Sequence, residues 1–116
     1  MMVTEHVVET VRDPRYVIGQ GGSGGAIAMA FASEGASVVC NDINPETLNR
    51  TVSDIHNAGE RAVALVADVA LEQTAIDLVD LAKTEFGEIS VLVNNAVFDL
   101  PLAPLTDIAL DDWQRA

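Results

Sequence analysis

The sequence has little cysteine, and it lacks long apolar runs. Its one cysteine, Cys40, cannot form an internal disulfide, and its place late in an apolar run predicts a buried small hydrophobic residue. No run reaches the ~18 apolar residues of a membrane span, and residues 1–15 lack the apolar block of a secretory signal. One cysteine and two scattered histidines, His6 and His56, give no metal-ligand spacing. We therefore expect a cytoplasmic protein without a metal site or a membrane partner.

Basic residues are also scarce. Six Lys and Arg face 18 Asp and Glu, the formal net charge is −12 at pH 7, and Lys83 is the only lysine. So acidic a surface disfavours nucleic acid and anionic membranes as partners. Two interpretations stay open. The protein is either an ordinary acidic one or a halophilic one, in which molar salt reduces the screening length to ~3 Å and so removes most of the repulsion between its acidic side chains. A higher melting temperature in molar KCl would favour the halophilic source.

Aliphatic residues are abundant. Hydrophobic residues make up 49% of the 116 positions but aromatic ones only 4%, a mixture typical of a parallel sheet covered by helices. The length suits one small domain. Phe31, Phe86 and Trp113 fit apolar helix faces, so we expect them in the core. Residues 1–15 show no clear period and are expected to form a poorly ordered arm, and residues 16–116 form the domain.

A glycine cluster follows a short apolar run at residues 16–18. Gly19, Gly21 and Gly24 match the Gly-x-Gly-x-x-Gly spacing of a dinucleotide-binding loop. In such a loop the glycines allow a tight turn, a close approach of the backbone to a pyrophosphate, and close packing of helix on strand. A helix that starts at Ser23 would offer its free N–H groups to the phosphates. A flexible linker is the alternative for this stretch taken alone.

Strand and helix patterns alternate along the rest of the chain. Strands are predicted at residues 16–18, 37–41, 62–67 and 89–93, helices at 23–34, 45–58 and 71–86, and a further helix opens at Asp111. Near-continuously apolar strands that alternate with helices predict an α/β fold, a doubly wound parallel sheet with right-handed crossovers.

Asp42 ends the second predicted strand, 23 residues after Gly19. In a dinucleotide fold a carboxylate here accepts hydrogen bonds from the adenosine ribose and repels a 2′-phosphate. The nearest downstream arginine is Arg50, so we expect NAD to be preferred over NADP. The alternative is that Asp42 is only a turn acid before Asn44.

The next two strands also end in polar turns. Asp68-Val69 follows the third predicted strand and Asn94-Asn95-Ala96 follows the fourth. Ligands of open α/β sheets bind at the carboxyl edge of the strands, although each of these residues alone is compatible with a plain turn.

From Ala26 onward the chain resembles the first half of a short-chain dehydrogenase/reductase (SDR). The matching segments are residues 26–28, 31–36, 38–42, 68–69 and 87–96, within a resemblance over roughly 16–116, and Asn-Asn-Ala is the most specific motif. The resemblance implies a Rossmann-like sheet of four strands in the order 3-2-1-4, in a truncated NAD(P)-binding domain. The implied cofactor-binding residues are Gly19, Gly21, Gly22, Ser23, Gly24, Asp42, Ile43, Asp68, Val69, Asn94 and Ala96.

By this resemblance Asp42 holds the ribose, and Asp68 and Val69 flank the adenine. The sequence departs from the family pattern in two places: Val97 replaces the glycine that follows Asn-Asn-Ala, and the glycine loop is one residue short. Family catalysis uses a Tyr with a Lys four residues on, but the single tyrosine, Tyr16, and the single lysine, Lys83, are not so spaced. We therefore assign no catalytic residue.

The sequence thus predicts the cofactor-binding half of an NAD-dependent SDR oxidoreductase, with a small-molecule substrate only if the chain continues. The alternatives are a non-catalytic dinucleotide-binding or interaction module, and an inactive gene remnant. The strand at 89–93 is central in the family's sheet and would be an edge here, so self-association through its unpaired backbone groups is a further expectation.

Overall fold

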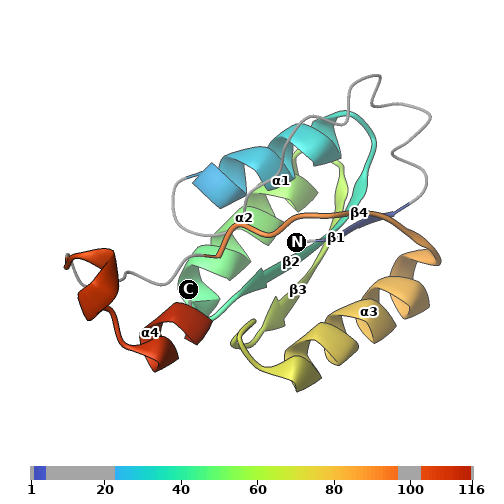
Figure 1. Cartoon of the computed structure of the whole chain (residues 1–116). Helices are drawn as coiled ribbons and strands as arrows, with labels where there is room; N and C mark the ends of the chain where they lie inside the picture. The colour runs from blue at the N-terminus through green and yellow to red at the C-terminus, as the bar shows by residue number, and fades with distance from the viewer. Residues whose placement is uncertain (1, 5–22, 97–102, 116) are drawn as a thin grey trace.

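The computed structural model describes residues 2–4, 23–96 and 103–115 (Figure 1). The elements are β1 (Met2–Thr4), α1 (Ser23–Ser33), β2 (Ser37–Asp42), α2 (Pro45–Asn57), β3 (Arg61–Val66), α3 (Glu72–Phe86), β4 (Ile89–Leu92), the 3-10 turn η2 (Leu105–Asp107) and α4 (Leu110–Arg115). Strands and helices alternate from α1 to β4, which confirms the α/β class that the sequence predicts.

The sheet has the strand order β3-β2-β1-β4. β2 and β3 are parallel and in register from Ser37 opposite Arg61 to Asp42 opposite Val66. β1 is antiparallel to both β2 and β4, so β2, β3 and β4 run in one direction. The carboxyl ends of these three strands therefore lie at the same edge of the sheet.

The position between β2 and β4 differs from the prediction. Residues 16–18, expected there as a parallel strand, lie outside the described residues, and Met2–Thr4 takes the position in the antiparallel direction. The prediction of a wholly parallel sheet was wrong in this respect. The physical reason is that a three-residue strand satisfies its neighbours' backbone groups in either direction. Met2–Thr4, within the predicted arm 1–15, forms a strand, and residues 5–15 lie outside the described residues, so the order of that arm stays a prediction.

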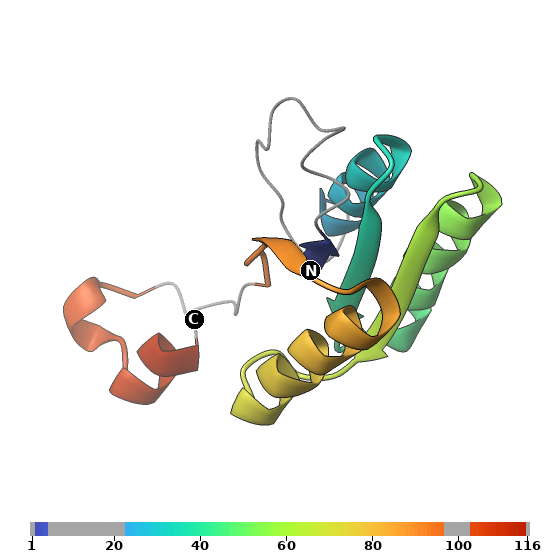
Figure 2. The same ribbon diagram turned by 90° about the vertical axis from the view of Figure 1, so that its right-hand side faces the viewer.

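Helices cover both faces of the sheet, α1 and α2 on one and α3 on the other (Figures 1 and 2). Successive side chains of β2 point to opposite faces of the sheet and so pack against both helical layers. Val38 and Cys40 pack in the cluster with α1 and α2, whereas Val39 packs with α3. Helices thus cover both faces of the sheet, as a doubly wound arrangement requires, and β2 is more buried than β3 and β4, which are partly exposed.

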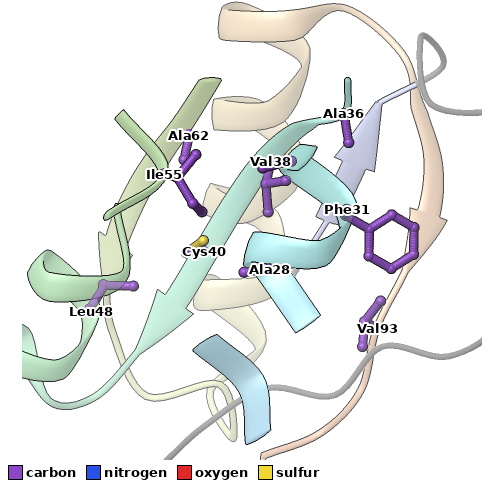
Figure 3. Packing of buried hydrophobic residues seen from close by; sticks show 10 residues of the cluster. Ala28, Phe31, Ala36, Val38, Cys40, Leu48, Ile55, Ala62 and Val93 are labelled. Carbon is purple, nitrogen blue, oxygen red and sulfur yellow. The ribbon is translucent and has the colours of Figure 1, made fainter. Parts of the chain in front are cut away.

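The larger core lies between the sheet and the α1–α2 layer (Figure 3). Its buried residues are Ala28, Phe31, Ala32, Ala36, Val38, Cys40, Leu48, Ile55, Ala62 and Val93. Cys40 and Phe31 are buried in it, as their positions in the sequence predicted. The two helices approach closely at Gly25, where a Cβ would lie 2.9 Å from Thr51 Oγ1.

The smaller core lies between the sheet and α3. Val39, Leu78 and Ala82 are buried in it, and half-buried aliphatic side chains surround them. Phe86, predicted to be in the core, packs at its border, and the Arg61 guanidinium lies 5.7 Å from the centroid of its ring. This contact ties the start of β3 to the end of α3.

Local signals in the sequence set the helix ends. Asn44 caps α2, its side chain accepting hydrogen bonds from the backbone N–H groups of Glu46 and Thr47. Gly59 and Gly87, which follow α2 and α3, have φ of 84° and 94°, a left-handed conformation that favours glycine. Within the described ranges, no helix has both the length and the apolar character needed to cross a membrane.

The last described residues, η2 and α4, lie to one side of the sheet and its helices (Figure 2). Trp113 in α4 is 47% exposed, so the prediction that it belongs to the core was wrong. A six-residue helix carries an apolar side chain on a helical face, but burial requires another element packed against that face.

Candidate functional site

The carboxyl ends of β2 and β3 lie side by side, and each is followed by a turn that contains an aspartate (Figure 1). Asp42 is the last residue of β2 and pairs with Val66, the last residue of β3. The backbone N–H of Ala67 then donates to the Asp42 carbonyl at 3.1 Å, which continues the ladder by one step. The two turns therefore leave the sheet from fixed and adjacent points.

The Asp42 carboxylate is held by its own loop. The side chain is only 4% exposed, and Oδ1 accepts a hydrogen bond from the backbone N–H of Asn44 at 2.6 Å. The Asn44 side chain in turn accepts from Glu46 N at 2.9 Å and Thr47 N at 3.3 Å in the first turn of α2. The buried carboxylate is thereby fixed in orientation at the start of a helix, whose N-terminus favours negative charge.

The turn after β3 repeats this local geometry in a more exposed setting. Asp68 is exposed, and its Oδ1 accepts from the backbone N–H of Ala70 at 2.9 Å. Ile43 and Val69, the residues after the two aspartates, are 66% and 46% exposed. Each turn thus offers one carboxylate followed by one exposed apolar side chain, which suits a ligand with hydroxyl groups and a flat apolar part.

Asn41 joins the two turns and was not among the sequence-predicted site residues. Its side-chain Nδ2 donates to the carbonyl oxygens of Leu65 at 2.9 Å and Ala67 at 3.0 Å. The only available sequence signal was a polar residue at the end of an apolar strand, next to Asp42. Such a residue is more often a turn former, so the pattern did not distinguish it.

The end of β4 belongs to the same edge because β4 runs in the direction of β2. Val93 is buried in the α1–α2 core, and the following Asn94 and Ala96 are exposed. Val97, where the sequence departs from the family pattern, lies outside the described residues. The structure thus brings Asn94 and Ala96 to the predicted edge, and their contact with a cofactor stays a prediction.

The glycine loop is described only at its end. Gly19, Gly21 and Gly22 lie outside the described residues, Ser23 is the first residue of α1, and Gly24 is buried in the first turn. The start of α1 lies toward the end of β2 where Asp42 stands (Figure 1). Binding of phosphates by this loop stays a prediction.

Two other candidate chemistries can be compared with the structure. Among the described residues, no group of three or more His, Cys, Asp or Glu side chains is arranged to hold a metal ion. Burial raises the pKa of the Cys40 thiol from 9.0 to about 11, because the thiolate would lose its hydration. Cys40 is therefore a structural thiol and not a nucleophile at neutral pH.

Comparison with known proteins identifies the family to which this fold and this arrangement of strand ends belong. The family model described as "short chain dehydrogenase" matches residues 16–116. The chain belongs to the short-chain dehydrogenase family. The family implied by the resemblance is thereby confirmed.

Several short-chain dehydrogenases and reductases are similar to this chain in sequence or structure. The 7alpha-hydroxysteroid dehydrogenase of Escherichia coli K12 is 41% identical over 88 residues, which cover 71% of this chain and 34% of that protein. A crystal structure of hydroxysteroid dehydrogenase from Escherichia coli superimposes with a TM-score of 0.68 at 37% identity, over 79% of this chain and 38% of that one.

A metagenomic short-chain oxidoreductase solved in complex with NADP has a TM-score of 0.70 at 28% identity, over 79% of this chain and 42% of that one. The chain thus spans about a third of the length of the curated relatives it matches. These likenesses confirm the Rossmann-like fold of the family.

Proposed function

We propose that this chain supplies the dinucleotide-binding part of an NAD-dependent oxidoreductase of the short-chain dehydrogenase type. The observation that carries the proposal is the buried Asp42 carboxylate at the end of β2, fixed through Asn44 N–H at 2.6 Å. The nicotinamide ring of such a cofactor supplies hydride transfer, and the residues of this chain bind and orient the adenosine half. Catalysis is proposed for a longer protein, because the matched region covers only 34% of the Escherichia coli K12 relative.

The described residues at the edge fit an adenosine ribose. One Asp42 oxygen accepts from the Asn44 N–H, and the carboxylate has further lone pairs with which to accept from ribose hydroxyls. Ile43 and Val69 offer apolar surface of the kind an adenine ring packs against. Asp68, after β3, is proposed to lie beside the adenine.

Asp42 also supports the preference for NAD over NADP. A buried carboxylate at the ribose position would face the added phosphate of NADP with like charge, which is unfavourable in a poorly hydrated setting. Arg50, the nearest downstream arginine in the sequence, is an exposed residue of α2. The metagenomic relative was solved with NADP, so the preference is proposed for this chain from its own Asp42.

Isothermal titration calorimetry of the full chain with NAD and with NADP tests the proposal. We expect NAD to bind at least about tenfold more tightly, because a hydrogen bond to a charged group contributes about 1.5–3 kcal/mol. Asp42→Asn should reduce this ratio. Asp54→Asn removes the same charge from an exposed position on α2 and should leave it unchanged. Equal affinity of the wild type for both dinucleotides would contradict the preference, and no heat with either would contradict the function.

A second candidate function is a non-catalytic interaction module, and the position of β4 favours it. β4 is at the edge of the described sheet, and its Leu92 is 57% exposed. An edge strand with exposed apolar side chains can pair with a second copy or another chain. Sedimentation velocity over a range of protein concentrations should then show association, and Leu92→Lys should reduce it. An inactive remnant would neither bind NAD nor associate in a defined stoichiometry.

A further inference from the structure

Asn41 makes two side-chain hydrogen bonds across the sheet at the edge where the proposed cofactor site lies. Its Nδ2 donates to Leu65 O at 2.9 Å and to Ala67 O at 3.0 Å. These two carbonyl groups stand on either side of Val66, the residue that pairs with Asp42 in the ladder. One amide therefore spans the last paired position of β3 from the strand that carries the proposed ribose carboxylate.

The second acceptor, Ala67, lies beyond the end of β3. Its N–H donates to the Asp42 carbonyl at 3.1 Å and its carbonyl accepts from Asn41 at 3.0 Å, so both of its polar backbone groups are bonded to β2. The next residue, Asp68, opens the turn in which its Oδ1 accepts from Ala70 N at 2.9 Å. Two hydrogen bonds thus hold Ala67 to β2, and Asp68 is the next residue of the chain.

We propose that Asn41 is a positioning residue for the bound dinucleotide. It fixes the turn after β3 against the turn after β2, and thereby the spacing between Asp42 and Asp68. The inference rests on the proposed function, since the spacing matters only if one ligand contacts both turns. A preorganised spacing lowers the entropy that is lost when a ligand orders its site. Loss of this spacing should therefore weaken ligand affinity without changing the fold.

The chemistry of the side chain supports this role. Both bonds go to carbonyl oxygens, and a neutral amide brings two N–H donors on one nitrogen. A serine offers one donor on a shorter side chain, and an aspartate would place negative charge between two carbonyl oxygens. An alanine leaves the Leu65 and Ala67 carbonyls without this donor.

Calorimetric titration of the full chain with NAD is the test, on the wild type, Asn41→Ala and Asn41→Ser. We expect Kd to increase about tenfold in Asn41→Ala, the equivalent of one or two lost hydrogen bonds, and less in Asn41→Ser. Amide hydrogen exchange at Ala67 should be faster in both variants without ligand.

Two controls separate positioning from a general loss of stability. Ile55→Val removes a methylene from the buried core and should lower the melting temperature with an unchanged Kd. Asn57→Ala changes an exposed asparagine at the end of α2 and should change neither.

The outcomes are distinguishable. If the wild type binds NAD and Asn41→Ala binds it within about twofold, the positioning role is wrong and the proposed function stands. If the Kd of Ile55→Val rises as much as that of Asn41→Ala, affinity follows stability, and the positioning role is again wrong. If the wild type binds no NAD, the proposed function fails, and the role of Asn41 fails with it.

Discussion

The two faces of the sheet are covered unequally. Among the described residues, ten are buried in one cluster on the α1–α2 face (Figure 3), whereas the cluster on the α3 face has three, Val39, Leu78 and Ala82. The helices differ in the same way, because α2 begins with a side-chain cap at Asn44 and α3 begins at Leu71 without one. Local stability follows buried apolar contacts, so we expect the α1–β2–α2 region to be the more stable part of the described chain.

Truncation of one buried side chain on each face gives the largest expected effect. Ile55→Ala should cost about 4 kcal/mol of unfolding free energy, because Ile55 is 0% exposed and the surrounding helices prevent collapse of the cavity. Leu78→Ala should cost about 2–3 kcal/mol, because α3 is freer to move onto the sheet. Urea denaturation measures both values, and a larger loss for Leu78→Ala would contradict the comparison.

Alkaline pH should weaken the α1–α2 face through Cys40. Burial raises its pKa to about 11, so the folded state keeps the neutral thiol at a pH where the unfolded chain ionises it near 9.0. The buried neutral thiol therefore contributes up to about 3 kcal/mol to the free energy of unfolding. This contribution is complete below pH 9 and is lost as the pH rises to 11.

Melting curves of the wild type and Cys40→Val between pH 8 and 11 measure this contribution. The difference between the two proteins should change with pH only above about 9, where the unfolded thiol starts to ionise. A constant difference across this range would show that Cys40 ionises in the folded protein as it does in the unfolded chain.

A smaller effect is expected where α1 meets α2. Gly25→Ala would place a Cβ 2.9 Å from Thr51 Oγ1, so one of the two helices or the Thr51 side chain must shift, at about 1–2 kcal/mol. Thr51→Ala in the same chain should relieve most of this loss. A double-mutant cycle by urea denaturation gives the coupling, and strictly additive effects would exclude the close contact.

The smallest effects concern the helix caps, and they should have opposite signs. Asn44→Ala removes the acceptor for Glu46 and Thr47 and should destabilise by about 1 kcal/mol. Leu71→Asn adds a cap where α3 has none and should stabilise by several tenths of a kcal/mol, since Leu71 is 58% exposed and loses little burial. Thermal melts measure the change in stability of both variants. A lower melting temperature of Leu71→Asn would show that contacts of the Leu71 side chain stabilise the start of α3.

The elements of the better-packed region were predictable from short-range signals. Asn44-Pro45 marks the start of α2, and Gly59 follows its end. The strand predicted at 37–41 is observed as β2, which extends one residue further to Asp42. Each of these features is determined by residues close in sequence. The position of Asp42 and Asp68 at one edge also followed, because parallel strands end on the same side.

The rest depends on partners that the local sequence does not specify. A three-residue strand such as β1 carries no clear pattern of its own, because its pairing and direction depend on which strand edges of the sheet are unpaired. The sequence therefore did not predict β1. Trp113 lies on an apolar helix face, but whether that face is buried depends on a neighbouring element. The two bonds of Asn41 need β3 in register, and no pattern within β2 indicates them.

We infer that the turns after β2 and β3 form the adenosine site, and the shifts of backbone amide NMR signals on titration with NAD locate the binding site residue by residue. We expect the largest shifts at residues 42–44 and 68–70, and small ones at Gly59 and Gly87, which precede β3 and β4 at the opposite edge of the sheet. Shifts confined to the opposite edge or to α4, or no shifts at millimolar NAD, would contradict it.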